Sequence, residues 1–269
     1  MSDSKVAVRL SELQLRIIVG LALIGVASTA LVLGGIAFWF LCIVLALLMM
    51  GEWASLAGTP PQFARLAQFA LSVPLAIMAP RFGAGPGFLA LGLLAGAAFF
   101  VVIVTRRPRL AAGLLYAGLP VMGLLLLRDQ KEGVIFTLWA LALVWMCDIG
   151  AYFAGRAIGG PKLAPTISPN KTWAGLAGGV VAASLFGAAM HWQFGLPWRL
   201  TLATPALAVL AQGGDLYESW LKRRAGVKDS GTILPGHGGV LDRLDGLVPV
   251  APVAALLAVA LPKLYHLLP

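Results

Sequence analysis

The sequence predicts an all-α integral membrane protein, from its hydropathy, its scarcity of charge and the length of its apolar runs. The chain has 269 residues, of which 59% are hydrophobic, and a mean hydropathy of +0.89. Only 12% of the residues are charged, about half the share of an ordinary soluble domain. A water-soluble globule of this size could not bury so much hydrocarbon. The two cysteines, Cys42 and Cys147, lie inside apolar runs, which argues against a disulfide scaffold.

Nine apolar runs predict membrane-spanning helices. Such a helix needs about 20 mostly apolar residues. The runs are continuous and lack the alternation of a membrane β-strand, so helices are predicted rather than a barrel. The predicted spans cover about residues 17–34, 36–50, 66–80, 87–105, 110–127, 133–154, 173–191, 199–220 and 247–264.

Glycines predict how some of these helices meet. The first two runs are separated only around Gly34-Gly35, which predicts a helical hairpin. The first run is interpreted as a retained span rather than a signal peptide, because a second apolar run follows at once. Small-xxx-small spacing lets membrane helices approach closely, either inside one molecule or in a homodimer. Two pairs have this spacing: Gly92/Gly96 and Gly175/Gly179.

The basic residues indicate the direction in which the chain crosses the membrane. With nine alternating spans, 15 of the 20 Lys and Arg residues fall on the side of the N-terminus. Because cytoplasmic loops carry the excess of basic residues, the N-terminus is predicted to be cytoplasmic and the C-terminus outside. A multi-pass protein of the cell inner (cytoplasmic) membrane is therefore expected. This signal does not explain the loops at 156–172 and 221–246, which mix cations with acids, glycines and prolines.

Acidic residues lie inside two of the predicted spans. Such residues are costly in a membrane, so the default interpretation is functional. Asp148 and Asp215 both lie toward the predicted cytoplasmic ends of their spans. Helical spacing places Asp215 on one face with Glu218, Ser219 and Lys222. The alternative for Asp148 is a neutral or paired structural acid between helices.

The loop at 221–246 is dense in charge. Five cations and three carboxylates lie between Lys222 and Asp245. The glycines around His237 let the backbone turn tightly and present N–H groups. Carboxylates beside cations indicate a hard divalent metal with a polyanion, because Mg²⁺ takes one or two carboxylates and completes its shell with phosphate oxygens and water. The residues alone therefore predict phosphate chemistry at the cytoplasmic face, without fixing the reaction.

This loop resembles the signature of the phosphatidate cytidylyltransferases, the CDP-diacylglycerol synthases. The matching positions are Ser219, Leu221, Lys222-Arg223, Lys228-Asp229, Pro235, His237-Gly238-Gly239 and Asp242-Arg243-Leu244-Asp245. A second block, residues 148–152 followed by 168–173, is similar to the other cytoplasmic segment of that family. The resemblance is clear over about 145–250 and only generic over the N-terminal spans.

The resemblance implies a reaction and assigns residues to it. The family transfers CMP from CTP to phosphatidic acid, giving CDP-diacylglycerol and pyrophosphate for phospholipid biosynthesis. The implied partners are CTP, phosphatidic acid and membrane lipid, with no nucleic acid. The implied cofactor is Mg²⁺ held by Asp215 and Asp242, with a second cation as an option. The implied catalytic residues are Lys222, Arg223, Lys228, Asp229, His237, Arg243 and Asp245. The implied substrate-binding residues are Asp148, Ser168, Lys171, Glu218 and Ser219.

Several of these assignments have alternatives. Asp229 and Asp245 would orient the cations or bind a second ion, or they form purely structural ion pairs. His237 would bind phosphate or donate a proton, or it folds the loop through a hydrogen bond. His191 and His266 lie at span ends on the far side and are interpreted as interfacial residues.

Two other functions compete with this one. A CTP-dependent lipid kinase would share the nucleotide face, although the matched signature argues against it. An ion-coupled transporter would explain the intramembrane acids, but the sequence shows no internal repeat of the kind that transporters carry. The expected organisation is one polytopic membrane domain over 1–269, with N-terminal helical spans in 1–130 and a catalytic half in 131–269.

Overall fold

Helices account for most of the chain that the computed structural model describes, which is residues 12–234, 236 and 238–260. A helix lies at each of the nine predicted spans. The helices are α1 (Glu12–Leu33), α2 (Gly35–Leu56), α3 (Pro61–Ile77), α4 (Phe88–Thr105), α5 (Pro108–Arg128), α6 (Gly133–Ile158), α7 (Trp173–Phe194), α8 (Trp198–Arg224), α9 (Leu241–Leu244) and α10 (Leu247–Ala255), which a π-helical turn (Leu256–Ala260) extends. The prediction of a mainly α-helical fold is confirmed.

Five of the described helices are long and apolar enough to cross a bilayer. These are α2, α4, α5, α6 and α7. The apolar parts of α1 and α10 are shorter. In the described part of the chain, the structure therefore supports a multi-pass membrane protein, whereas the number nine stays a prediction.

The helix ends follow from local backbone chemistry. Gly34 and Gly35 have φ values of 60° and 49°, which a residue with a Cβ rarely adopts, and the turn joins α1 to α2 as predicted. Pro61 and Pro108 begin α3 and α5, where a missing N–H costs no hydrogen bond. Thr172 caps α7 by accepting a hydrogen bond from the Gly175 N–H at 3.0 Å.

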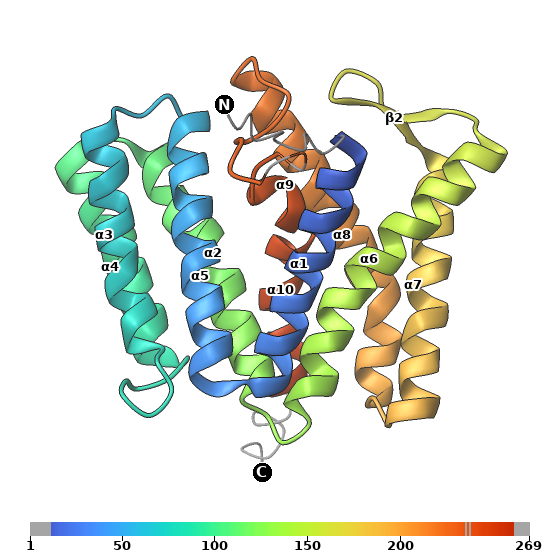
Figure 1. Ribbon diagram of the computed structural model, residues 1–269, viewed down its shortest axis with the longest axis horizontal. Coiled ribbons are helices and arrows are strands. Elements are labelled where there is room, and N and C mark those ends of the chain that lie inside the picture. Colours follow the sequence, from blue (N-terminus) through green and yellow to red (C-terminus); the bar gives the residue numbers. More distant parts are fainter. Residues whose placement is uncertain (1–11, 235, 237, 261–269) are drawn as a thin grey trace, which may run out of the picture.

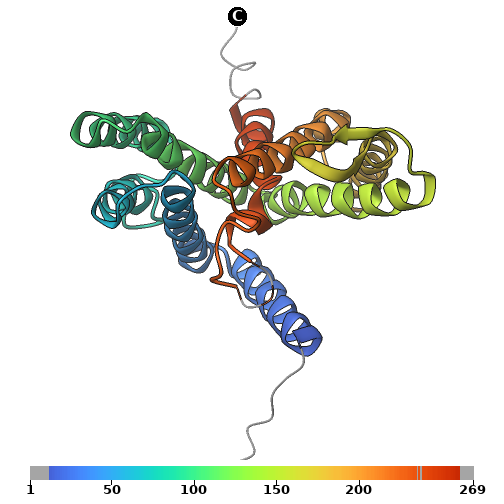
Figure 2. The same cartoon turned by 90° about the horizontal axis from the view of Figure 1, so that it is seen from above.

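The helices run in alternating directions, so the loops at 156–172 and 221–246 lie at the same end of the molecule (Figure 1). Seen from above, the molecule has three arms (Figure 2). One arm contains α2 to α5, the second contains α6 to α8, and α1 forms the third. At the junction, α10 packs against α5, α6 and α8. Gly123 of α5 lets the backbones of α5 and α10 lie close together, because an added Cβ there would lie 2.6 Å from the carbonyl oxygen of Ala251.

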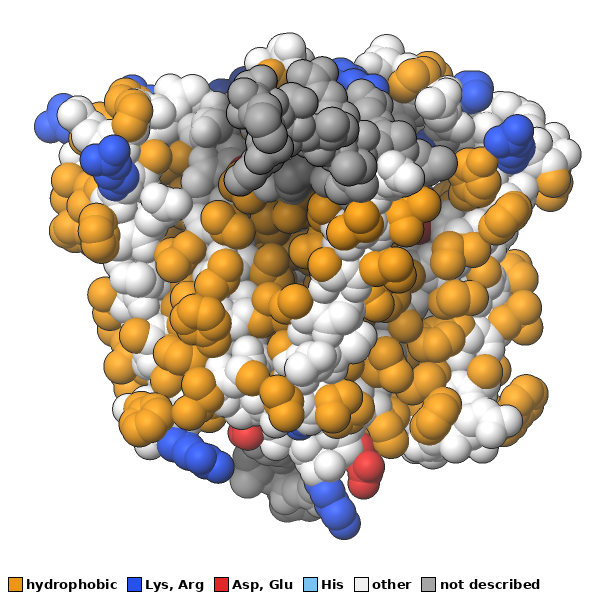
Figure 3. Space-filling model, viewed as in Figure 1, with side chains coloured by type: hydrophobic (Ala, Val, Ile, Leu, Met, Phe, Trp, Pro, Cys, Tyr) orange, Lys and Arg blue, Asp and Glu red, His pale blue; other side chains and the backbone are white. Residues whose placement is uncertain are grey.

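The outer surface of the bundle is apolar. Figure 3 shows hydrophobic side chains over the middle of one face, with Lys and Arg at both ends. Phe88, Phe69 and Leu185 expose 94%, 73% and 67% of their area. Large exposed apolar surfaces of this kind face lipid rather than water. The hydrophobic side chains therefore mark the part of the molecule that lies in the bilayer.

A small β-hairpin departs from the predicted all-α fold. Within residues 12–234, 236 and 238–260, the two strands are β1 (Lys162–Ala164) and β2 (Ser168–Thr172). They pair antiparallel, with Lys162 opposite Thr172 and Ala164 opposite Ser168. The all-α prediction did not include this hairpin within the loop at 156–172, because the strands are short and lack alternating apolar residues. The hairpin ends directly at α7 and so fixes the position of Lys171 at the end of the bundle.

Candidate active site

The polar residues of interest belong to elements that meet toward the end of the molecule carrying the hairpin and the loop before α9 (Figure 1). They come from α6, β2, α8 and the segment 230–245. They form two clusters of carboxylates and cations, which we name after their lysines.

The first, the Lys171 cluster, contains Asp148, Lys171, Gln212 and Asp215. Lys171 forms an ion pair with Asp215. Its Nζ also donates to Gln212 Oε1 at 3.0 Å, and Gln212 Nε2 donates to Asp148 Oδ1 at 3.0 Å. The hydroxyl of Ser219, one turn after Asp215, donates to Asp215 Oδ1 at 3.3 Å. The structure thus joins α6, β2 and α8 through one polar chain.

The Lys171 cluster lines a cavity. Its volume is about 670 Å³, and Tyr152, Arg156 and Asn170 also line it. Such a cavity combines two acids with two cations beside an apolar bundle. The cations suit an anionic ligand, and the acids suit a cation bound to that ligand. Sequence analysis missed Gln212, whose signal was a polar residue three positions before Asp215 in an apolar helix.

The second, the Lys222 cluster, contains Glu218, Lys222 and Asp242. Lys222 Nζ lies 2.9 Å from Glu218 Oε2 and 2.6 Å from Asp242 Oδ1. The side chains of Glu218 and Asp242 are 0% and 5% exposed, and that of Lys222 is 14% exposed. A buried carboxylate needs a counter-charge and hydrogen-bond donors, and here one ammonium serves two carboxylates.

Asp242 also accepts hydrogen bonds from its own loop. Its Oδ2 accepts from the Ser230 N–H at 2.9 Å, the Ser230 hydroxyl at 3.0 Å and the Gly239 N–H at 2.8 Å. Burial alone would raise the pKa of the Asp242 carboxyl. The hydrogen bonds from Lys222, Gly239 and Ser230 outweigh burial and hold this pKa below its ordinary value. Asp242 is therefore charged and firmly oriented.

Charges from both clusters act on the carboxyl of Asp245. Its Oδ1 accepts a hydrogen bond from the Gly246 N–H at 2.7 Å. Burial, and next the negative charge of Asp215, raise the pKa of Asp245 to about 7. The added charge of a nearby cation would lower this pKa, so Asp245 is sensitive to whatever binds beside Asp215.

Glu52 is the main residue that sequence analysis missed. It lies on α2 and is 4% exposed. Its carboxylate accepts hydrogen bonds from the Val240 N–H and the Leu241 N–H, both at 2.8 Å, and from the Ser230 hydroxyl at 3.1 Å. The rule that drew attention to Asp148 and Asp215 applies equally to Glu52, since it follows the apolar run 36–50. Its hydrogen-bond partners lie 178 to 189 residues away in the sequence, so no local sequence pattern indicates these contacts.

The remaining predicted site residues are not members of the two clusters. Ser168 lies on β2 and is half-buried, as is Ser219 on α8. Four more residues, which are close in sequence to Lys222 or Asp242, are exposed: Arg223, Lys228, Asp229 and Arg243. Arg223 donates to the Val227 carbonyl at 3.5 Å, which closes the turn after α8. His237 lies outside the described residues, so its predicted role stays a prediction.

The predicted metal ligands belong to different clusters. Asp215 pairs with Lys171 and Asp242 pairs with Lys222. Among the described residues, no three His, Cys, Asp or Glu side chains are close enough to form a complete metal site. Mg²⁺ takes only one or two carboxylates and completes its shell with phosphate and water. The carboxylate donors present here fit Mg²⁺ bound together with a phosphate substrate.

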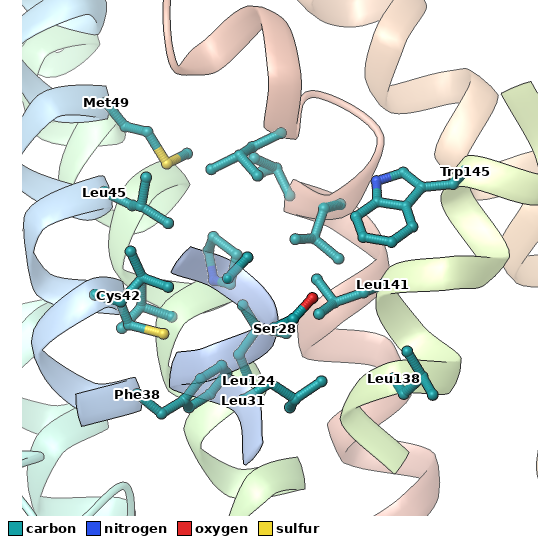
Figure 4. A pocket seen from close by; sticks show the side chains of 17 residues that line it. Ser28, Leu31, Phe38, Cys42, Leu45, Met49, Leu124, Leu138, Leu141 and Trp145 are labelled. Carbon is teal, nitrogen blue, oxygen red and sulfur yellow. The ribbon is translucent and has the colours of Figure 1, made fainter. Parts of the chain in front are cut away.

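A different cavity, at the junction of the three arms, is apolar (Figure 4). Its volume is about 160 Å³, and side chains from α1, α2, α5, α6 and α10 line it. Cys42, Leu45 and Met49 face Leu141 and Trp145 across it (Figure 4). Because the lining is almost entirely hydrocarbon, this cavity suits an apolar chain rather than a nucleotide.

Comparison with known proteins identifies similar sequences over most of the chain. The cytidylyltransferase family model matches residues 14–261. The phosphatidate cytidylyltransferase of Brucella suis biovar 1 is 43% identical over 250 residues, which cover 90% of this chain and 92% of that protein. The phosphatidate cytidylyltransferase of Pseudomonas aeruginosa is 37% identical over 262 residues, which cover 91% of this chain and 96% of that protein.

Proposed function

The chain belongs to the cytidylyltransferase family and is a nucleotidyltransferase, and we propose that it transfers CMP from CTP to phosphatidic acid. The products would be CDP-diacylglycerol, a precursor in phospholipid biosynthesis, and pyrophosphate. The observation that carries this proposal is the meeting of cations and carboxylates at one end of an apolar bundle. Both substrates are polyanions and one is a lipid, so a charged site at the end of membrane helices suits them.

In the proposed reaction the lipid supplies the nucleophile. An oxygen of the phosphatidic acid phosphate attacks the α-phosphorus of CTP, and the bond from that phosphorus to the oxygen bridging the β-phosphate breaks. Pyrophosphate leaves with the electron pair of that bond. The second pKa of a phosphate monoester is about 6, so the attacking oxygen is largely deprotonated at neutral pH. Positioning two polyanions is therefore the main task of the protein.

We assign the residues to this task by their charge and place. Lys171, which lines the cavity, and Ser168, at the start of the same strand β2, would bind the nucleotide. Lys222, Arg223, Lys228 and Arg243 would neutralise phosphate charge around the Lys222 cluster. These groups act on the leaving pyrophosphate as well, because electrostatic stabilisation is strongest where charge develops.

Asp215 and Asp242 would hold Mg²⁺, and a second cation remains an option near Asp245. When bound, the metal would supply positive charge to the phosphates and orient them. Asp215 lines the cavity of the Lys171 cluster, which supports its part in this assignment. Each carboxylate would exchange its lysine partner for the metal, which leaves Lys171 and Lys222 free to bind phosphate.

We also propose nine spans, a cytoplasmic N-terminus and an inner-membrane location. The alternating helix directions and the basic residues at the site end support this topology (Figure 1). A homodimer is the further proposal. The Gly92 and Gly96 positions support it, because a Cβ at either would meet no other atom within 4 Å in one molecule.

The experiment is a pyrophosphate-release assay on the detergent-purified protein. CTP, phosphatidic acid and Mg²⁺ are each omitted in turn, and each omission is expected to abolish release. CTP labelled on the α-phosphate then separates the reactions, because the label enters lipid for a cytidylyltransferase and stays in CDP for a lipid kinase. Release without lipid, or label confined to CDP, would contradict the proposal.

A further inference from the structure

Three successive backbone N–H groups before and within α9 are divided between two carboxylates. The Gly239 N–H donates to Asp242, whereas the Val240 and Leu241 N–H groups donate to Glu52. Asp242 belongs to the same short segment, but Glu52 comes from α2 in another arm of the molecule. The backbone of residues 239–241 is thus held by one carboxylate from its own loop and by another from α2.

Ser230 joins the two carboxylates directly. Its Oγ lies 3.1 Å from Glu52 Oε2 and 3.0 Å from Asp242 Oδ2. A hydroxyl has one hydrogen, so it donates to one carboxylate at a time, while its N–H donates to Asp242 throughout. Any movement of Glu52 therefore changes the hydrogen bonds that Asp242 receives.

The backbone closes around the Glu52 carboxylate. A Cβ added at Gly231 or at Gly239 would lie 2.7 Å from Glu52 Oε1, so neither position has room for a side chain. Gly239 is the last glycine of the matched signature, and its backbone N–H serves Asp242 while its bare Cα faces Glu52. Glu52 is thus enclosed by the loop that carries the predicted metal ligand.

We infer that Glu52 is a positioning residue that sets the orientation of Asp242 by holding a segment from α2, namely Ser230 and residues 239–241. This inference rests on the proposed role of Asp242 in the transfer reaction. Glu52 does not touch the cavity of the Lys171 cluster, so it acts on catalysis through Asp242 rather than on nucleotide binding. Loss of its carboxylate leaves two buried N–H groups without an acceptor of full strength, which favours opening of the segment.

The test compares four full-length variants in detergent. Glu52→Gln keeps the size of the side chain but replaces one acceptor oxygen with a donor that faces backbone N–H groups. Glu52→Asp keeps the carboxylate, and Ser230→Ala removes only the shared hydroxyl. Glu132→Gln is the matched control, because Glu132 is exposed at the opposite end of the molecule, before α6.

Two measurements are made on each variant. The first is kcat and KM for CTP in the pyrophosphate assay. The second is hydrogen–deuterium exchange of peptides that contain residues 238–246, measured without substrates. Glu52→Gln is expected to lower kcat about ten-fold or more, to change KM for CTP much less, and to speed exchange at Val240 and Leu241. Glu52→Asp should recover part of kcat, Ser230→Ala should show a smaller loss, and Glu132→Gln should match the wild type.

Wild-type kcat and wild-type exchange in Glu52→Gln would overturn the inference, and so would a loss confined to KM. Should Glu52→Gln fail to fold, Glu52→Asp decides, because its shorter side chain shifts the carboxylate away from the two N–H groups, and wild-type kcat and wild-type exchange in that variant would equally overturn the inference. Should the wild type release no pyrophosphate, the proposed function fails instead. In that case faster exchange at Val240 and Leu241 in Glu52→Gln still supports the structural hold of Glu52 on the segment, and unchanged exchange refutes it.

Discussion

Lys222 is the cation that balances two carboxylates at once. Glu218 and Asp242 are almost fully buried, and their closest positive charge is the ammonium of Lys222. The pair of ions contributes little net stability by itself, because desolvation opposes the Coulomb attraction. Removal of the lysine, by contrast, leaves both carboxylates without their counter-charge, and Asp242 keeps only the hydrogen bonds of its own loop. The stability of this end of the bundle therefore depends on a residue that we also assign to phosphate binding.

Lys222→Met is expected to destabilise the protein by about 3–5 kcal/mol, the cost of breaking a buried ion pair from one side. The measurement is the melting temperature in detergent, with Lys131→Met as the control, because Lys131 is exposed between α5 and α6. The double variant Lys222→Met with Glu218→Gln should recover part of the loss, since it removes one of the two unpaired charges. A melting temperature equal to that of the wild type in Lys222→Met would show that the cluster is hydrated and uncoupled.

Asp245 predicts a pH dependence of metal binding. Its pKa is raised to about 7, so the carboxyl is mostly protonated at pH 6 and mostly charged at pH 8. A cation near Asp215 is attracted by the charged form, and binding must release the proton. Affinity for Mg²⁺ should therefore rise from pH 6 to pH 8, by up to about ten-fold per pH unit below the pKa.

Calorimetric titration with Mg²⁺, without substrates, measures this dependence without contributions from phosphate groups. Asp245→Asn should flatten it, because the amide does not titrate. The same slope in Asp245→Asn as in the wild type would assign the proton to a different group.

At the scale of elements, the two glycine pairs predicted from spacing have different surroundings. Gly175 and Gly179 face α6, where an added Cβ would lie 3.0 Å from the Ala151 carbonyl oxygen and 2.7 Å from that of Cys147, respectively. Close packing of α6 and α7 is therefore what this pair provides. Spacing alone could not distinguish the two pairs, because the sequence does not say which helices become neighbours.

Gly150→Ala tests whether this seam holds the site together. The added Cβ would lie 2.5 Å from Ala182 Cβ and 2.6 Å from the Gly178 carbonyl oxygen. Overpacking of this kind costs about 1–3 kcal/mol and would separate α6, which carries Asp148, from α7. Both the melting temperature and turnover should fall. Gly92→Ala is the control, because nothing lies within 4 Å of an added Cβ there, and equal losses in the two variants would show that the α6–α7 seam is not special.

The sequence was most informative where chemistry and structure follow from local spacing. The i, i+4 relations among Asp215, Ser219, Glu218 and Lys222 became actual contacts, because a helix fixes those distances. The hairpin at 162–172 was not predictable, since its strands of three and five residues have no apolar alternation. Glu52 was missed for another reason. Its partners lie across the fold, and only the packing of α2 against α9 brings them together.

At the scale of the whole molecule, the apolar runs predicted the position of every long helix but not the membrane crossing of each. The run at 199–220 became α8, a helix of 27 residues that is not among the five apolar ones. Asp215, Glu218 and Lys222 of α8 belong to the two clusters, so residues that lower its hydropathy also form the candidate site. Low hydropathy therefore does not exclude α8 as a span, and its membrane crossing stays a prediction.

The orientation of the bundle can be tested across α6, which joins the two ends of the molecule. Arg156, Lys162 and Lys171 lie at the site end, and the positive-inside rule places this end in the cytoplasm. Thr166→Cys, in the turn between β1 and β2, and Lys131→Cys, at the other end of α6, put a thiol at an exposed position on each side. The native Cys42 and Cys147 are buried and should give little background.

A maleimide that cannot cross membranes should label Lys131→Cys in right-side-out vesicles and Thr166→Cys in inside-out vesicles. The physical reason is that CTP is a cytoplasmic polyanion that cannot cross the bilayer, so the Lys171 cluster must open to that side if the proposed reaction is correct. Labelling of both variants from one side would show that α6 does not span. The reversed pattern would place the site outside the cell, away from CTP, and would contradict both the topology and the proposed reaction.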